Sequence, residues 1–151
     1  MKVLVVEDGF EYSQMLERFL AEGFVWSRAG SGPEALKMLE AQSYDALFLD
    51  MRFDRIAPEL LLGDLKQVAD RFNGDPLQAR TFLQNNQGNF ILNAIRQTGC
   101  ELPALMSYDF DAEPRRWAHI KDKFAPVDYL EGNATPPEIA QLLHHLGEGP
   151  L

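Results

Sequence analysis

The chain has 151 residues, of which 46% are hydrophobic and 11% aromatic, so it suits one ordinary domain with a packed core rather than a disordered segment. It carries 23 acidic and 14 basic residues, a net charge of −9. This balance disfavours binding to nucleic acid or to anionic membranes, because both need clustered Lys and Arg. The single cysteine, Cys100, excludes a disulfide framework, and the apolar run at 3–6 is too short for a signal peptide or a membrane span. We therefore expect a cytoplasmic, single-domain protein.

The first fifty residues alternate between strand and helix patterns. Two runs are apolar on both faces, which is typical of buried parallel strands. Ser31 and Glu34 have the spacing of a capping box and open the second helix. The elements expected here are strand 2–6, helix 11–22, strand 24–27, helix 31–41 and strand 45–50.

The alternation of strand and helix patterns is interrupted after Arg52. Apolar residues at helical spacing predict a helix over 58–72, which the pair Asn73–Gly74 ends. A short helix begins at Asp75, and residues 85–88 have the composition of a loop. The remaining expected elements are helix 89–97, strand 102–106, helix 113–124, strand 127–130 and a last helix that a capping box at Thr135–Glu138 opens and that runs through His145.

Strands that alternate with helices predict an α/β fold, a doubly wound parallel sheet covered on both faces. Right-handed crossovers place the carboxyl ends of all strands at one edge, where sites form. Glu7, Asp8 and Asp50 follow two of these strands, and Ser107 follows the fourth. Three converging carboxylates repel one another and need a cation. Because the ligands are all oxygen, this cation is expected to be Mg²⁺, which can organise phosphoryl transfer onto a carboxylate.

At these residues the sequence resembles the receiver domain of two-component response regulators. The resemblance is carried by KVLVVED at 2–8, DALFLD at 45–50, PALMS at 103–107 and DYL at 128–130. It implies a flavodoxin-like sheet of five parallel strands in the order 2-1-3-4-5. It also implies a stand-alone receiver domain over 1–147, with a helical insertion over about 54–87 and a tail over 148–151.

The resemblance also implies a role for each site residue. Glu7, Asp8, Asp50 and the backbone carbonyl of Arg52 would bind Mg²⁺. Asp50 would be the phospho-acceptor, Ser107 the switch hydroxyl and Tyr129 the switch aromatic. A histidine kinase or a phosphotransfer protein would supply the phosphoryl group.

Two features depart from the family pattern. Receivers carry a Lys after the fifth strand, where this chain has Gly132, and Lys121 or Lys123 would have to replace it. A segment of 37 residues, 51–87, stands in place of a short loop after the acceptor. This insertion either packs its apolar stripe onto the domain or covers the site and docks a partner. Arg52 and Asp109 flank the site in the family pattern, and an ion pair between them is one option.

Two functions remain open. The first is a single-domain response regulator that receives a phosphoryl group on Asp50 and signals through protein contacts, either at the face of Trp117 and Tyr129 or at the insertion 58–84. The second is a pseudo-receiver, a phosphorylation-independent protein-interaction module, which Gly132 and the insertion favour. An enzyme such as an aspartyl-nucleophile phosphatase is not expected, because the acid it needs two residues after the nucleophile is Arg52 here.

Overall fold

The structure is a computed structural model that describes residues 1–148. The tail predicted at 148–151 lies outside these residues apart from Glu148, which ends the last helix. Among residues 1–148, no helix has both the length and the apolar character needed to span a membrane.

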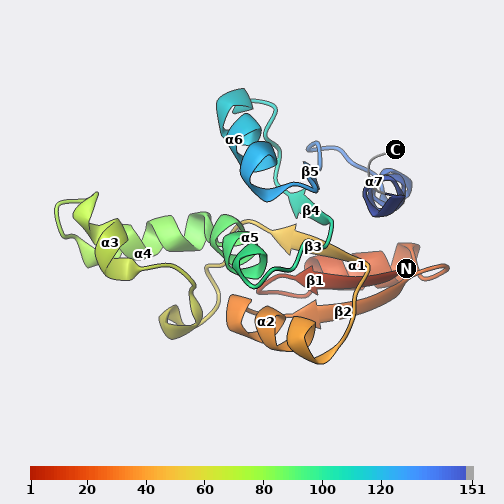
Figure 1. Cartoon of the computed structure of the whole chain (residues 1–151), viewed down its shortest axis with the longest axis horizontal. Coiled ribbons are helices and arrows are strands. Elements are labelled where there is room, and N and C mark those ends of the chain that lie inside the picture. Colours follow the sequence, from red (N-terminus) through yellow and green to blue (C-terminus); the bar gives the residue numbers. More distant parts are fainter. Residues whose placement is uncertain (149–151) are drawn as a thin grey trace.

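A parallel sheet of five strands forms the centre of the molecule (Figure 1). The strand order is β2-β1-β3-β4-β5, so the predicted fold class and order are confirmed. The strands are β1 (Lys2–Val6), β2 (Val25–Ala29), β3 (Ala46–Asp50), β4 (Ala104–Ser107) and β5 (Val127–Tyr129). The helices are α1 (Glu11–Phe19), α2 (Gly32–Ala41), the 3-10 helix η1 (Pro58–Leu60), α3 (Leu65–Asp70), α4 (Pro76–Asn85), α5 (Gln87–Gln97), α6 (Pro114–Phe124) and α7 (Pro136–Glu148).

The central strands are apolar on both faces because helices cover both faces of the sheet. Leu4 and Leu47 pack with α2, α5 and α6, whereas Val3 and Phe48 pack with α1 and α7. These four side chains are fully buried. The continuous apolar runs of the sequence therefore correspond to strands between two helical layers, as parallel sheets require.

Capping predictions agree with the structure at two helices. The Ser31 hydroxyl accepts from the backbone N–H of Glu34 at the start of α2. At the start of α7, the Thr135 hydroxyl donates to the Glu138 carboxylate and accepts from the Glu138 N–H. Helix α7 continues three residues beyond the predicted end at His145. Helix α1 ends at Phe19 rather than at 22, because Leu20 leaves the helical conformation and its carbonyl accepts from the Trp26 indole at 2.8 Å.

The helix predicted over 58–72 is wrong. The chain forms only η1 and, after a break, the six-residue helix α3. Gly63 has a φ of 112°, a conformation that interrupts a helix, and the Asp64 side chain then caps α3 through the N–H of Gln67. The apolar spacing across 58–72 therefore belongs to two short elements that pack separately.

The loop predicted at 85–88 is also wrong, because only Asn86 separates α4 from α5. Gln87 is fully buried, and its side-chain amide binds both the N–H and the carbonyl of Leu62 at 2.7 and 3.0 Å. A Cβ at Gly88 would lie 2.5 Å from the carbonyl oxygen of Asp50. Gln87 and Gly88 therefore form the first turn of α5, which begins in close contact with the end of β3.

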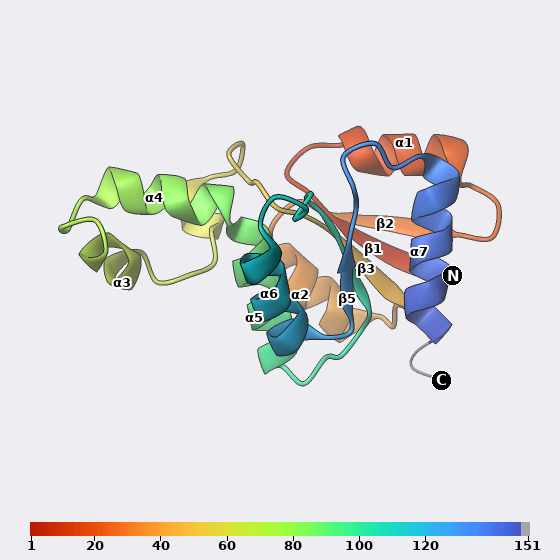
Figure 2. The same ribbon diagram turned by 90° about the horizontal axis from the view of Figure 1, so that it is seen from above.

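Residues 58–85, hereafter the arm, project sideways from the sheet (Figure 2). The arm has its own small apolar cluster, built on Val68, Ala69, Ala79 and Leu83. Phe82 of the arm also packs against Phe90 of α5, and the two ring centroids lie 6.3 Å apart. The apolar stripe of the insertion is thus divided: Val68 and Ala69 are buried in the arm cluster, Leu61 and Leu62 pack against the main core, and Leu65 is exposed.

Candidate functional site

The predicted acceptor and hydroxyl lie side by side at the carboxyl edge of the sheet. Asp50 ends β3 and Ser107 ends β4, and the two residues are paired in register. β1 is the other neighbour of β3, so Glu7 and Asp8, which follow it, lie beside Asp50. The spatial order of the strands, with β3 between β1 and β4, therefore brings these four residues together at one edge.

Asp50 lies in a partly buried position that disfavours its negative charge. Burial raises its pKa to about 6, and the charge of Asp8 adds to this effect. One carboxylate oxygen accepts from the backbone N–H of Met51 at 2.8 Å, which works in the opposite direction. A cation or a proton near Asp50 would therefore be favourable.

Glu7 is buried, and both of its carboxylate oxygens are engaged by α1. They accept from the N–H groups of Tyr12 at 3.2 Å and Ser13 at 2.8 Å, in the first turn of the helix. Burial nevertheless raises its pKa, and the charge of Asp50 contributes. Glu7 thus fixes the beginning of α1 above the sheet.

Asp8 is held by Arg55, a residue that sequence reasoning did not identify. The backbone N–H of Arg55 donates to Asp8 Oδ2 at 2.9 Å, and its guanidinium lies 3.4 Å from Asp8 Oδ1. The same guanidinium makes two contacts with Glu11, at 2.7 and 3.1 Å, and it lowers the pKa of Glu11 to about 2. Within residues 1–148, no group of three or more His, Cys, Asp or Glu side chains is arranged to hold a metal ion.

The donor chemistry at this edge still suits Mg²⁺. Asp8 and Asp50 offer carboxylate oxygens, the ligands that this cation prefers. Burial, with a smaller contribution from the charge of Asp8, raises the pKa of Asp50, and a cation would offset both effects. Both Asp8 oxygens contact Arg55 in this structure.

A pocket of about 540 Å³ opens onto Asp50. Its lining residues are Asp50, Met51, Arg52, Asn85, Asn86, Ser107, Tyr108 and Arg116. The Arg116 guanidinium donates to Asn86 Oδ1 at 2.6 Å and lies 3.2 Å from Glu113. Arg116 and Asn86 were missed by sequence analysis, because one comes from α6 and the other from the junction of α4 and α5.

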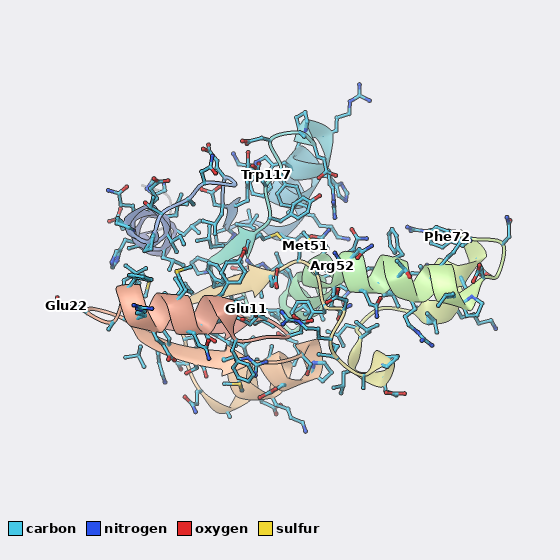
Figure 3. All side chains as sticks on the ribbon, turned by 180° about the vertical axis from the view of Figure 1, so that it is seen from behind. Glu11, Glu22, Met51, Arg52, Phe72 and Trp117 are labelled. Carbon is cyan, nitrogen blue, oxygen red and sulfur yellow. The ribbon has the colours of Figure 1, made fainter. Side chains whose placement is uncertain are left out.

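Arg52 lies near the base of the arm, just after β3 (Figure 3). Its guanidinium pairs with Asp54 at 3.0 Å. Asp109 instead accepts from the N–H groups of Asp111 and Gly132. The ion pair considered between Arg52 and Asp109 is therefore absent, since each residue is satisfied by a near neighbour.

Tyr129, the predicted switch aromatic, packs edge-on against Trp117 and Phe110, with ring centroids 4.7 and 5.4 Å away. Its hydroxyl donates to Asp111 at 2.5 Å, and this bond raises the pKa of Tyr129 to about 12. Trp117 is half-buried against the same cluster. The aromatic group therefore connects β5 to α6.

Gly132 is exposed, and its N–H donates to Asp109 Oδ2 at 3.0 Å. A Cβ placed there would lie 3.4 Å from that oxygen, an ordinary contact. Neither Lys121 nor Lys123 lines the pocket at Asp50 or the neighbouring pocket that contains Gly132. No lysine thus occupies the position left by Gly132 among the residues lining these two pockets.

No protein-family model matches this sequence, and no curated protein matches it. Solved structures do. The receiver domain of a Francisella response regulator is 18% identical, with a TM-score of 0.65 over 97% of this chain and 96% of that one. The receiver domain of NtrX from Brucella abortus is 17% identical, with a TM-score of 0.67 over 98% and 99%. A receiver domain protein from Clostridium thermocellum is 16% identical, with a TM-score of 0.62 over 97% and 94%. The chain therefore has the fold of response regulator receiver domains.

Proposed function

We propose that this protein is a response regulator module that receives a phosphoryl group on Asp50. The observation that carries the proposal is the register of Asp50 with Ser107 at adjacent strand ends, where both line one open pocket beside Asp8. This arrangement combines a nucleophilic carboxylate, a hydroxyl donor and an acidic cation ligand. The fold shared with receiver domains supports the same assignment.

The chemistry is a phosphoryl transfer between two protein side chains. A carboxylate oxygen of Asp50 attacks the phosphorus of a phosphohistidine on a histidine kinase or phosphotransfer protein, and the bond from phosphorus to imidazole nitrogen breaks. An acyl phosphate forms and the imidazole leaves. Although the pKa of Asp50 is raised to about 6, its carboxylate is mostly ionised at neutral pH and can act as the nucleophile.

Three residues that line the pocket are the proposed donors to the phosphoryl oxygens: Ser107 through its hydroxyl, Arg116 through its guanidinium and Asn86 through its amide. Hydrogen bonding to Ser107 is the proposed trigger of the switch. Tyr129 then changes its contacts in the aromatic group around Trp117.

We assign the Mg²⁺ ligands to Asp8, Asp50 and the Arg52 backbone carbonyl. Glu7 contributes negative charge to this set, since its oxygens already accept hydrogen bonds from α1. When bound, Mg²⁺ offsets the negative charge of the two carboxylates and of the incoming phosphoryl group. These residues serve as ligands and acceptor, and the outcome is a signal rather than turnover of a substrate.

A groove of about 540 Å³ between the arm and α6 supports signalling through a protein partner. Its lining residues are Arg71, Phe82, Asn86, Asn89, Phe90, Asn93, Arg116, His119, Ile120, Lys123 and Phe124. None of them is acidic although the chain has a net charge of −9, so the groove suits an acidic, partly apolar segment. The arm and the neighbouring face of Trp117 and Tyr129 are thus the proposed partner surfaces, in a protein we place in the cytoplasm.

A second function, a phosphorylation-independent interaction module, is favoured by two specific observations. Gly132 supplies no cation to the acceptor, and Arg55 holds Asp8. Under this alternative the site residues stabilise the edge of the sheet, and the arm carries the function. The two functions differ in one measurable property, the acceptance of a phosphoryl group by Asp50.

The test is the intact mass of the protein after incubation with Mg²⁺ and acetyl phosphate. The proposal predicts one added phosphoryl group in the wild type and none in Asp50→Asn. A receiver domain known to react serves as the positive control. An unchanged wild-type mass beside a reacting control would exclude the proposed function and leave the interaction module.

A further inference from the structure

Building on the proposed function, we propose that Arg55 is an internal cation that competes with Mg²⁺ for the Asp8 carboxylate. Arg55 then determines how tightly the site binds a divalent cation. It belongs to the segment that leads from β3 into the arm, so Arg55 is one link between the metal site and the arm.

Asp8 is almost completely enclosed by its neighbours, with 2% of its side chain exposed. Both of its carboxylate oxygens contact Arg55, one through the backbone N–H and one through the guanidinium. Mg²⁺ requires close, nearly octahedral oxygen ligands at about 2.0–2.1 Å, and the positively charged guanidinium beside the same carboxylate would repel it. Cation binding at Asp8 therefore requires the Arg55 guanidinium to withdraw.

Glu11 keeps Arg55 in this position. Its two carboxylate oxygens contact two guanidinium nitrogens at 2.7 and 3.1 Å, which is the bidentate geometry of a strong pair. Gly9 makes room for this pair, because a Cβ there would lie 2.5 Å from Arg55 Nη2. Arg55 thus has a defined position between Glu11 in the first turn of α1 and Asp8.

Competition for one carboxylate makes the two cations mutually exclusive and thermodynamically linked. Whatever free energy Arg55 contributes to the Asp8 contact must be given up when Mg²⁺ binds, and the reverse also holds. Removing the guanidinium should therefore tighten Mg²⁺ binding without any new ligand. Because Arg55 is half exposed, the effect should be modest, about fivefold.

The test is the Mg²⁺ dissociation constant of the full chain, measured by titration calorimetry at constant ionic strength for wild type and Arg55→Gln. Arg80→Gln is the matched control, because Arg80 is exposed on the arm and its loss changes the net charge equally. We expect Arg55→Gln to bind Mg²⁺ about fivefold more tightly and Arg80→Gln to match the wild type. Thermal unfolding of each variant checks that it is folded.

Equal affinity in wild type and Arg55→Gln would overturn the competition while leaving a Mg²⁺ site for the proposed function. Absence of Mg²⁺ binding in both proteins would overturn the competition and the Mg²⁺-dependent function together. A gain of the same size in Arg80→Gln would also overturn the proposal, because it would reduce the effect to net charge.

A second readout follows the contact itself. The backbone amide of Arg55 donates to Asp8 Oδ2, so its NMR resonance reports whether that bond persists. The proposal predicts that Mg²⁺ shifts this resonance with the dissociation constant found by calorimetry. An unshifted Arg55 amide at saturating Mg²⁺ would contradict the proposal even if the affinities differ.

Discussion

The sheet and the arm use different physical means to stay folded. In the sheet, helices cover both faces of strands that are fully buried. The arm instead has a cluster centred on four buried residues and projects into solvent (Figure 2). Hydrogen bonds between Gln87 of α5 and Leu62 hold its base, and Arg55, just before the arm, contacts Asp8. The junction residues therefore decide how the arm and the site affect one another.

The largest effect is expected from Gly88→Ala at this junction. The new Cβ would collide with the backbone carbonyl of Asp50 at 2.5 Å and lie 2.9 Å from Met51 Cα. Neither backbone atom can easily yield, so we expect a loss of about 3 kcal/mol in the free energy of unfolding. Urea denaturation measures it, with Gly132→Ala as the control whose Cβ would make only an ordinary 3.4 Å contact with Asp109 Oδ2. Equal stability of Gly88→Ala and wild type would contradict the tight approach of α5 to β3.

Loss of the Gln87 hydrogen bonds to Leu62 should destabilise the arm more than the sheet. Gln87→Ala leaves the N–H and carbonyl of Leu62 without their side-chain partners. We expect a cost of about 1–3 kcal/mol, because these groups are partly enclosed. Hydrogen exchange should show faster exchange in α3 and α4 with little change in β1 and β3. Gln78→Ala, which removes only an exposed contact with Asp75, serves as the comparison.

Neutralising Asp50 should stabilise the fold at neutral pH. Its folded pKa of about 6 lies above its ordinary value of 3.8, so the protonated form favours folding at low pH and that contribution is lost as pH rises from about 4 to 6. Asp50→Asn keeps the side chain uncharged, and we expect it to gain about 1–3 kcal/mol at pH 7. Urea titrations should show this gain shrinking as pH falls from about 6 to 4 and absent below pH 4. A destabilised variant at pH 7 would contradict the assigned environment.

A smaller change in stability, under about 0.5 kcal/mol, is expected for Gly132→Lys, because the position is exposed and has room for a Cβ. Its effect should appear in phosphorylation, since the new ammonium can bind the phosphoryl group. We expect about fivefold more phosphorylated protein at early times of the acetyl phosphate reaction. This factor corresponds to the net free energy of one added hydrogen bond, about 1 kcal/mol. Asn133→Lys places the same charge one residue further on. An equal gain there would show that position 132 has no special role.

The sheet was predictable from sequence because its determinants are local. A strand buried on both faces must be apolar throughout, as 2–6 is, and a cap such as Ser31 acts within one turn. The pairing of Asp50 with Ser107 also depends on β3 lying next to β4, a strand order that the resemblance to receiver domains implied. These features need no knowledge of side-chain geometry.

The arm and its contacts were not predictable in the same way. Leu61 and Phe72 have the spacing of one long helix, but the positive φ of Gly63 divides it. Gln87 and Gly88 have a loop composition, yet they are buried because α5 begins against Asp50. Arg55 meets Asp8 across 47 positions of sequence, through a turn whose path depends on the whole insertion.

The central claim, that Asp50 accepts a phosphoryl group, is tested most directly by chemical trapping. The protein is treated with Mg²⁺ and acetyl phosphate, reduced with borohydride and digested, and the peptide containing position 50 is sequenced by mass spectrometry. We expect homoserine at position 50, the reduction product of an aspartyl phosphate. Unmodified aspartate at 50, with trapping in a control receiver treated alongside, would contradict it.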